Sequence, residues 1–441
     1  MIRSERRHLG LVLLLSVVGC LSCSDIAGDV DGVDGDDPIG DAQIAWLENH
    51  AVPINSAAPE LDEPNLSVLQ GTIGDAPIVG MGEATHGTAE FWQIRQKLSR
   101  YLVEEMGFTA ILHEAPFPNS LYIDAYVTEG EGTALEAHQK LGYWRYQEMQ
   151  DLIAWMREYN VQRGEGEPAL HYFGYDCAFR SWTESINLIA AYLEVVDPAA
   201  VDEITTRLEN YTLEDAQYVY AFLAANADEY IAQSSMEEYQ LILRIAANLE
   251  PSWQVWYNLE HGIPESDIRE GFNIGNVNWI IDNLLDGGKV IIWAHNGHVG
   301  NTYLENSGTQ AQMLGSRLKE QYGEDYYIIG TEFYGGSFLA WDRCEGNPFE
   351  FTVHQAARPR AGAYAYWFHQ AGIPLFYLDL SQVNYSQEET IWLVGPMNIR
   401  FIGASYCAAD DAEHYYSASL PVHYDGIVHF EVTTPTTSIT F

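Results

Sequence analysis

The stretch VGMGEATHGTAEF, residues 79–91, joins an apolar run to the start of a helix. Residues 76–82 suit a buried strand, and Thr88 stands where it can cap the helix that follows. The apolar side chains of that helix recur at helical spacing: Phe91, Ile94, Leu98 and Leu102. A carboxylate and an imidazole, Glu83 and His86, lie in the turn. A strand, a turn and a helix in this order form the repeating unit of α/β folds.

Further apolar runs that suit strands lie along the chain and alternate with helical patterns: residues 109–114, 170–176, 289–300, 325–333, 373–380, 398–404 and 425–433. Residues 180–284 differ, because they contain successive helical patterns and no convincing strand. This order predicts an α/β domain over residues 41–441, with a central, largely parallel sheet flanked by helices. An all-helical subdomain is expected as an insert at about residues 180–284.

The composition excludes several classes of protein. The chain has 63 acidic and 21 basic residues, a formal net charge of -42, and this field repels nucleic acid and anionic lipid. A hydrophobic share of 47% with 12 tryptophans is ample for a packed core. The acidity is interpreted as a solvated surface that keeps the protein soluble.

Residues 1–23 are typical of an export signal, because three arginines precede an apolar run that is too short to span a bilayer. The run ends in Val-Val-Gly-Cys, which resembles the lipobox of bacterial lipoproteins and makes Cys20 the expected lipidation site. Cys23 is a second candidate, and a plain secretory signal is the alternative. The Gly/Asp-rich residues 24–40 predict a tether. We therefore expect an exported cell-envelope lipoprotein that meets the membrane only through its lipid anchor.

Three cysteines follow the tether: Cys177, Cys344 and Cys407. Export would permit a disulfide, and Cys344–Cys407 is the preferred pair, although the sequence leaves the pairing open.

Ionisable residues stand at the ends of four predicted strands. Glu83 and His86 follow the first, and Glu114, Asp176 and His295 end three others. The carboxyl ends of parallel strands lie at one edge of a sheet, where ligand sites form. Each residue alone could be an ordinary turn or surface residue. Their coincidence at corresponding strand ends instead favours a shared site.

Arg95 lies on the apolar stripe of the helix that follows His86. A buried guanidinium needs a partner, because an unpaired buried charge is very costly. Either the side chain extends to the edge of the helix, or it pairs with Glu83 or Glu114 or binds a substrate oxygen.

Several catalytic motifs are absent from the sequence. There is no G-x-S-x-G nucleophile elbow, P-loop, H-E-x-x-H motif or G-x-G-x-x-G after a strand, and the cysteines lack metal-ligand spacing. Histidine and carboxylate chemistry remains, acting on water directly or through a metal.

Two motifs resemble the erythromycin esterase family, whose bacterial members hydrolyse the macrolactone ester of macrolides. They are GEATHGTAEFWQIRQKLSRYLVEEMGFTAILHE at residues 82–114 and VIIWAHNGHV at residues 290–299. Weaker likeness at residues 155–160, 312–330 and 424–434 extends the resemblance over nearly the whole chain after the tether.

The resemblance implies a hydrolase in which His86 is the general base that takes a proton from water. Glu83 and Glu114 would hold that water and tune the imidazole. The groups that would orient the site or stabilise the oxyanion are Arg95, His295 and His298. No covalent nucleophile and no cofactor are needed in this scheme, and the substrate would be a small-molecule ester, with macrolactones as one class.

Substrate contacts are expected from Asp176, Tyr143 and Trp144, and the protein is expected to be a monomer. Two other functions stay open at this point. One is a hydrolase with a divalent metal between His86 and its neighbours Glu114 and His298. The other is a surface-tethered protein that binds a glycan or a hydrophobic small molecule in an aromatic cleft.

Overall fold

The computed structural model describes residues 39–61, 63–178, 182–306, 309–359, 361–440. The expected signal peptide, most of the expected tether and Cys20 lie outside these residues. In the described part of the chain, the main sheet has ten strands. They are β1 (Val52–Pro53), β2 (Ile78–Glu83), β3 (Phe108–Pro116), β4 (His171–Asp176), β5 (Lys289–His295), β8 (Tyr326–Asp342), β9 (Phe351–Ala356), β10 (Leu375–Asp379), β12 (Ser405–Tyr406) and β14 (Gly426–Thr433).

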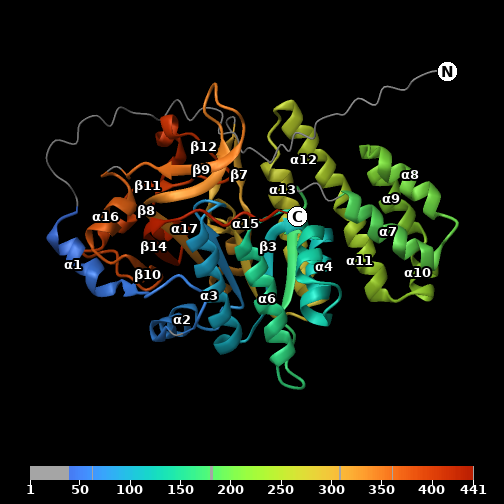
Figure 1. Ribbon diagram of the computed structural model, residues 1–441, viewed down its shortest axis with the longest axis horizontal. Coiled ribbons are helices and arrows are strands. Elements are labelled where there is room, and N and C mark those ends of the chain that lie inside the picture. The colour runs from blue at the N-terminus through green and yellow to red at the C-terminus, as the bar shows by residue number, and fades with distance from the viewer. Residues whose placement is uncertain (1–38, 62, 179–181, 307–308, 360, 441) are drawn as a thin grey trace.

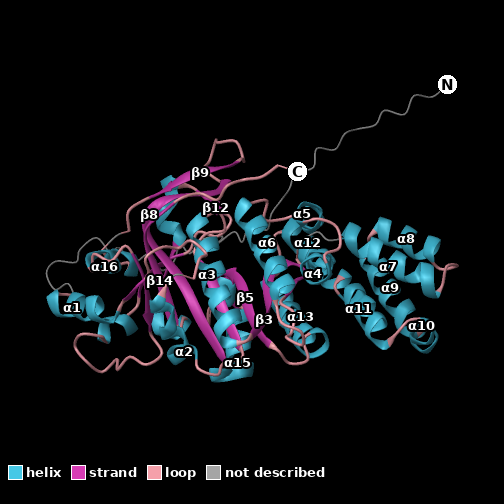
Figure 2. Cartoon of the chain, turned by 60° about the horizontal axis from the view of Figure 1, so that its bottom comes forward, coloured by secondary structure: helices cyan, strands magenta, loops and turns pink. Residues whose placement is uncertain are grey.

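The strand order is β1-β10-β14-β8-β2-β5-β3-β4, with β9 and β12 attached to β8. The strands from β14 to β4 are parallel, while β1, β10 and β9 pair in antiparallel fashion. Figure 2 shows β8 continuing past the body of the sheet, where it forms a hairpin with β9. The prediction of an α/β fold with a largely parallel sheet is confirmed.

Successive side chains of the central strands enter two different hydrophobic cores. Val290 and Ile292 of β5 pack in one core, and Ile291 and Trp293 pack in the other. A strand that is buried on both faces reads as a continuous apolar run, as the sequence of β5 does.

Helices cover both faces of the sheet (Figures 1 and 2). One core is closed by α2 (Val68–Ile73), α3 (Ala89–Met106), α5 (Ala134–Leu141) and α6 (Gln147–Gln162). The other includes residues from α1 (Asp41–His50), α4 (Phe117–Glu129), α14 (Asn296–Val299), α15 (Leu314–Tyr322), α16 (Tyr364–Gln370) and α17 (Leu420–His423). Short 3₁₀ helices occupy Pro64–Ser67, Gly323–Asp325, Ile391–Val394 and Ala408–His414.

Between β4 and β5, the described residues form helices only. These are α7 (Trp182–Val196), α8 (Val201–Asn210), α9 (Leu213–Ala225), α10 (Ala227–Gln233), α11 (Met236–Ala247), α12 (Leu249–His261) and α13 (Ser266–Leu284). Helices α7 to α11 form a lobe beside the sheet (Figure 1), and α13 returns the chain to it. Their inward side chains continue the core that contains α4 and α15. Among the described residues, no helix has the length and apolarity that crossing a membrane requires.

The region predicted as a strand at residues 398–404 differs from the prediction. Its first part is β11 (Met397–Arg400), which pairs with β13 (Tyr415–Ala418) outside the main sheet. A second small ribbon joins β6 (Tyr303–Asn306) and β7 (Thr309–Gln312). Residues 401–404 turn across the end of β2, where the Ile402 N–H donates to the carbonyl of Ala84 at 3.2 Å. The expected disulfide Cys344–Cys407 is formed and joins this region to the end of β8.

Thr88 occupies the N-cap position of α3, but its side chain makes no capping hydrogen bond. Its hydroxyl instead contacts that of Thr85 at 2.5 Å. The prediction of a side-chain cap is therefore wrong, because the hydroxyl of Thr85, three residues earlier, takes the place of the backbone N–H as the partner.

Candidate active site

The ends of the parallel strands meet as predicted. Glu83, the last residue of β2, is directly opposite His295, the last residue of β5. Asp176 ends β4, and Glu114 lies two residues before the end of the neighbouring strand β3. Gly82 allows Asn296, the residue after β5, to pack closely against β2, because a Cβ at residue 82 would overlap the Asn296 side chain.

His86 is held by a carboxylate that is itself held by an arginine. Its Nδ1 lies 2.8 Å from Glu83 Oε1, and Arg95 Nη2 lies 2.5 Å from Glu83 Oε2. Both Glu83 and Arg95 have side chains only 1% exposed, whereas that of His86 is 16% exposed. A proton on Nδ1 donates to Glu83 and leaves Nε2 of His86 as the basic nitrogen.

Arg95 confirms the prediction that a guanidinium on the apolar stripe must be paired, and Glu83 is the partner. The guanidinium also lies over the rings of Trp92 and Trp293, 5.1 and 4.7 Å from their centroids. Burial lowers the pKa of Arg95, and the charge of Glu83 acts in the opposite direction. Arg95 therefore orients Glu83 from behind and does not face the solvent.

His295 lies beside His86, with 5.3 Å between the ring centroids. Its Nδ1 accepts a hydrogen bond from the N–H of Gly297 at 3.2 Å, which places the ring proton on Nε2. Among the described residues this buried Nε2 has no hydrogen bond of good geometry, although the backbone carbonyl of Ala84 lies near the ring and acts as a weak acceptor. Burial lowers the pKa of His295 well below its ordinary value, and His86 and His298 add to that effect. A neutral ring whose N–H is not held by a well-formed hydrogen bond is suited to donate to a substrate oxygen.

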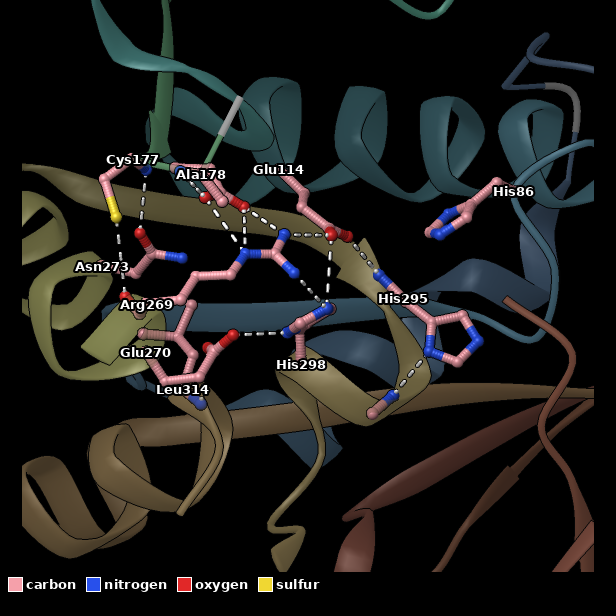
Figure 3. A network of polar contacts seen from close by, with 12 residues as sticks. His86, Glu114, Cys177, Ala178, Arg269, Glu270, Asn273, His295, His298 and Leu314 are labelled. Carbon is pink, nitrogen blue, oxygen red and sulfur yellow. Dashed lines mark hydrogen bonds and ion pairs between the residues drawn. The ribbon is translucent and has the colours of Figure 1, made fainter. Parts of the chain in front are cut away.

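Arg269 of α13 forms the centre of a second buried network (Figure 3). It donates to Glu114 Oε1 at 2.9 Å and binds Asp176 through both Nε and Nη2. Burial opposes the charge of Arg269, but Asp176 and Glu114 outweigh it and raise its pKa well above the ordinary value. Asp176 therefore lies behind Arg269, and its Oδ1 also accepts from the N–H of Ala178 at 2.8 Å.

His298 lies between two carboxylates. Its Nδ1 is 2.9 Å from Glu270 Oε1, and its Nε2 is 3.3 Å from Glu114 Oε1. Burial lowers the pKa of His298, but Glu114 and Glu270 outweigh burial, so the net pKa is raised above the ordinary value. The geometry favours an imidazolium at this position.

Glu114 connects the two halves of the site. Its Oε1 meets Arg269 and His298, and its Oε2 accepts from the backbone N–H of His295 at 3.1 Å. Burial raises the pKa of Glu114, but His298, Arg269 and His86 outweigh burial and lower it far below the ordinary value. Glu114 is thus a fixed anion between His86 and the Arg269 network.

Two loops surround His86. In one, Phe401 packs edge-on against His295 at 4.4 Å, and the Gly403 carbonyl accepts from the N–H of His86 at 3.4 Å. In the other, Trp144 lies 5.1 Å from the His86 ring, and its indole N–H donates to the Glu114 carbonyl at 3.0 Å. Tyr143 precedes it, and its carbonyl lies 3.2 Å from His138 Nε2.

The structure also has a cavity of about 380 Å³ in the helical lobe, and none of the predicted site residues lines it. Its aromatic lining residues are Trp182, Tyr211, Trp253, Trp256 and Tyr257.

The erythromycin esterase family model matches residues 103–433, more than half of the chain. The chain belongs to the erythromycin esterase family. It is 25% identical over 333 residues to an erythromycin esterase type II of Escherichia coli, an alignment that covers 67% of this chain and 78% of that relative. Family membership and this relative support a hydrolase.

Two solved structures share the fold of this family member. A Bacillus cereus protein superimposes with a TM-score of 0.76 at 25% identity, over 90% of this chain and 98% of that one. A mutant of the erythromycin esterase EreC in its open conformation superimposes with a TM-score of 0.67 at 18% identity, over 88% and 99% of the two chains.

The donor set of this family member does not suit a metal between His86, Glu114 and His298. Both ring nitrogens of His298 already face carboxylates, and Arg269 contacts Glu114 and lies 3.5 Å from His298 Nε2. A permanent cation within the ligand set opposes a second cation. In the described part of the chain, no three His, Cys, Asp or Glu side chains are grouped so that they could hold a metal ion.

Two residues of this site were missed in the sequence, Arg269 and Glu270. The spacing of Arg269, Asn273, Asn276 and Ile280 gives the buried face of α13. That face carries Asn273 and Asn276 four and seven residues after Arg269, so the sequence shows no apolar stripe like the one that marked Arg95. Glu270 is buried on the same helix, and its partner His298 and the partners of Arg269 all lie on other elements, so local spacing marks neither residue.

Proposed function

We propose that the protein is a carboxylic ester hydrolase in which His86 acts as a general base on water, without a metal and without a covalent nucleophile. The substrate would be a small-molecule ester, with macrolactones as one class to test. Members of the same family and the esterase relative support this reaction, and the site supplies groups for each step.

The observation that carries the proposal is the line Arg95–Glu83–His86. Arg95 fixes Glu83, Glu83 fixes the Nδ1 proton of His86, and the more exposed imidazole keeps Nε2 available as a base. When Nε2 takes a proton from water, the imidazolium forms beside the Glu83 carboxylate, which stabilises it. The resulting hydroxide would attack the ester carbonyl carbon, and the carbonyl oxygen would become an oxyanion. Collapse of this intermediate would break the bond between the carbonyl carbon and the alcohol oxygen, and the His86 imidazolium would return its proton to the leaving alcohol.

His295 and Arg269 support the later steps in this proposal. The Nε2–H of His295, which makes only a weak contact with the Ala84 carbonyl, would donate to the oxyanion at the place where charge develops. Arg269 and the His298 imidazolium would keep the Glu114 carboxylate ionised close to His86 and His295. Trp144 and Tyr143 would contact the substrate from the loop beside His86.

The test is hydrolysis of an ester panel by the purified protein and by the variant His86→Gln. General bases contribute about 10²- to 10⁴-fold, so kcat/KM of the variant should fall by at least about 100-fold. The matched control is His369→Gln, because His369 pairs with Glu431 at 2.9 Å in the same His–carboxylate arrangement on other elements. Full activity of His86→Gln would refute the proposal.

A panel of macrolides, simple lactones and acylated glycans would identify the ester class. Each compound should be assayed after exhaustive treatment with a chelator and again after addition of Zn²⁺, Mg²⁺ or Mn²⁺. Unchanged kcat supports water activation by His86 alone. Loss of activity on chelation with recovery on addition of one ion would refute metal independence.

We also propose that the protein is exported and anchored by lipid on Cys20. The lipobox-like sequence before Cys20 supports this location, and the Cys344–Cys407 disulfide is typical of an oxidising compartment. The variant Cys20→Ser should lose incorporation of labelled fatty acid, whereas Cys23→Ser should keep it. The opposite result would assign lipidation to Cys23.

A further inference from the structure

A segment beyond the main sheet binds the loop that carries His86. We call residues 434–440, which follow β14, the strap. The Thr434 carbonyl accepts from the N–H of Ala89 at 2.9 Å, and the Thr436 N–H donates to the Gly87 carbonyl at 3.0 Å. Both the N–H and the hydroxyl of Thr434 donate to the carboxylate of Glu90, each at 2.7 Å.

The same strap binds a second loop, between α5 and α6. The Gln147 N–H donates to the Thr437 carbonyl at 2.8 Å, and the Ile439 N–H donates to the Arg145 carbonyl at 2.9 Å. The Thr437 N–H in turn donates to the carboxylate of Glu148, at 3.2 Å from each oxygen. The strap therefore joins two loops that lie far apart in the sequence.

The second loop presents Trp144 to the active site in an uncommon backbone conformation. Its φ is 52°, in the left-handed region that a bulky residue rarely adopts. The indole N–H donates to the Glu114 carbonyl at 3.0 Å, and the ring lies 5.1 Å from that of His86. Local preference opposes this conformation, so contacts on either side of Trp144 must maintain it.

We propose that the strap and Trp144 form a positioning element for His86. The strap would hold the two loops together, and the indole would hold the imidazole and favour its cationic form, because the face of an aromatic ring attracts a cation. The catalytic meaning of this role rests on the proposed hydrolase function, in which His86 becomes an imidazolium in each turnover.

Other charged groups also act on His86. Glu83 contacts its Nδ1, with Arg95 behind that carboxylate. Glu114 and the buried rings of His113 and His295 lie on the neighbouring strands and interact with it electrostatically. Replacement of Trp144 also removes its hydrogen bond to the Glu114 carbonyl and its stacked contact with His113. Phenylalanine and leucine both lose that hydrogen bond, so a difference between these two variants reports on the aromatic ring.

The first test compares the full-length protein with Trp144→Phe and Trp144→Leu. The titration of His86 is followed by NMR of its ring proton without substrate, and kcat and KM are measured separately. An aromatic–cation contact at a partly exposed site predicts a fall of about half a pKa unit for His86 in Trp144→Leu, and little change in Trp144→Phe. The value of kcat should fall several-fold more in the leucine variant than in the phenylalanine variant, with a smaller change in KM.

Equal effects of phenylalanine and leucine, or an unchanged His86 titration in Trp144→Leu, would overturn the role of Trp144. The NMR measurement needs no ester. If no ester is hydrolysed even by the unchanged protein, the proposed function fails while the positioning role is still tested.

The second test addresses the strap with the double variant Glu90→Gln/Glu148→Gln. Each glutamine retains one acceptor oxygen and presents an NH₂ group to an N–H donor, so the strap is weakened at both loops. The control is Glu158→Gln, because Glu158 is exposed on the same helix as Glu148 and its side chain accepts a hydrogen bond from Gln162 one turn away.

Hydrogen exchange of the Ala89 and Gln147 amides should accelerate at least about tenfold in the double variant, together with a fall in kcat and in the titration midpoint of His86. Faster exchange with unchanged kcat and an unchanged His86 midpoint would overturn the role of the strap.

Discussion

Replacement of Arg269 by methionine is expected to destabilise the protein strongly. The side chain of Arg269 is 5% exposed, and it binds Asp176, which is fully buried, and Glu114. Methionine fills much of the same volume but removes the charge. The variant would then contain three buried carboxylates, those of Asp176, Glu114 and Glu270, with His298 as the remaining cation in contact with two of them.

Loss of one partner from a buried ion pair costs about 3 to 5 kcal/mol. A control lies close by: Arg317 Nη2 is 2.6 Å from Asp267 Oδ1, but the Asp267 side chain is 73% exposed. Exposed pairs contribute about 0 to 1 kcal/mol. Arg317→Met should therefore change the free energy of unfolding by at most about a third of the change in Arg269→Met, although both ion pairs involve α13.

The two variants are compared with the unchanged protein by urea unfolding at pH 7 and pH 4. In the folded protein the pKa of Glu114 is held low, because His298 and Arg269 outweigh the effect of burial. A lowered carboxylate pKa gives stability that is present above the unfolded value and is lost as the pH falls. The difference in the free energy of unfolding between Arg269→Met and the unchanged protein should therefore be larger at pH 7 than at pH 4. Equal effects of Arg269→Met and Arg317→Met, or a difference that grows on acidification, would refute this account.

Three further predictions concern other parts of the molecule. Glu83→Gln should lower kcat/KM by at least about tenfold with little change in KM, because the amide cannot stabilise the His86 imidazolium as a carboxylate does; equal losses for substrates of different size, measured by steady-state kinetics, would support this role. The raised pKa of His298 stabilises the folded protein below the unfolded pKa of about 6.5, and this stability is lost as the pH rises through the folded value. The loss in the free energy of unfolding on His298→Gln should therefore be greater at pH 6 than at pH 9. Reduction of the Cys344–Cys407 disulfide, whose cysteines are 63 residues apart, should lower the free energy of unfolding by about 4 kcal/mol, because the unfolded chain gains entropy. Denaturation with and without dithiothreitol measures this change, and an unchanged denaturation midpoint would contradict the prediction.

The sequence predicted the parallel part of the sheet well, because each central strand is buried on both faces and is therefore a continuous apolar run. The same pattern placed Glu83, Glu114, Asp176 and His295 at one edge. The prediction failed at residues 398–404, where a short apolar run forms an outlying ribbon and then a turn over Ala84. An apolar segment that covers a site has the same local pattern as a strand, so periodicity could not separate them.

What the sequence alone determined was the set of groups at the strand ends and the need for a partner to Arg95. Both follow from local rules, since strand direction places carboxyl ends together and a buried charge requires an opposite charge. Only the tertiary structure decided which carboxylate binds which cation, brought Arg269 and Glu270 from α13 into the site, and placed Trp144 against His86 through the strap. These contacts join residues on separate elements, and their energy depends on distance and burial in three dimensions, which local spacing along the chain does not contain.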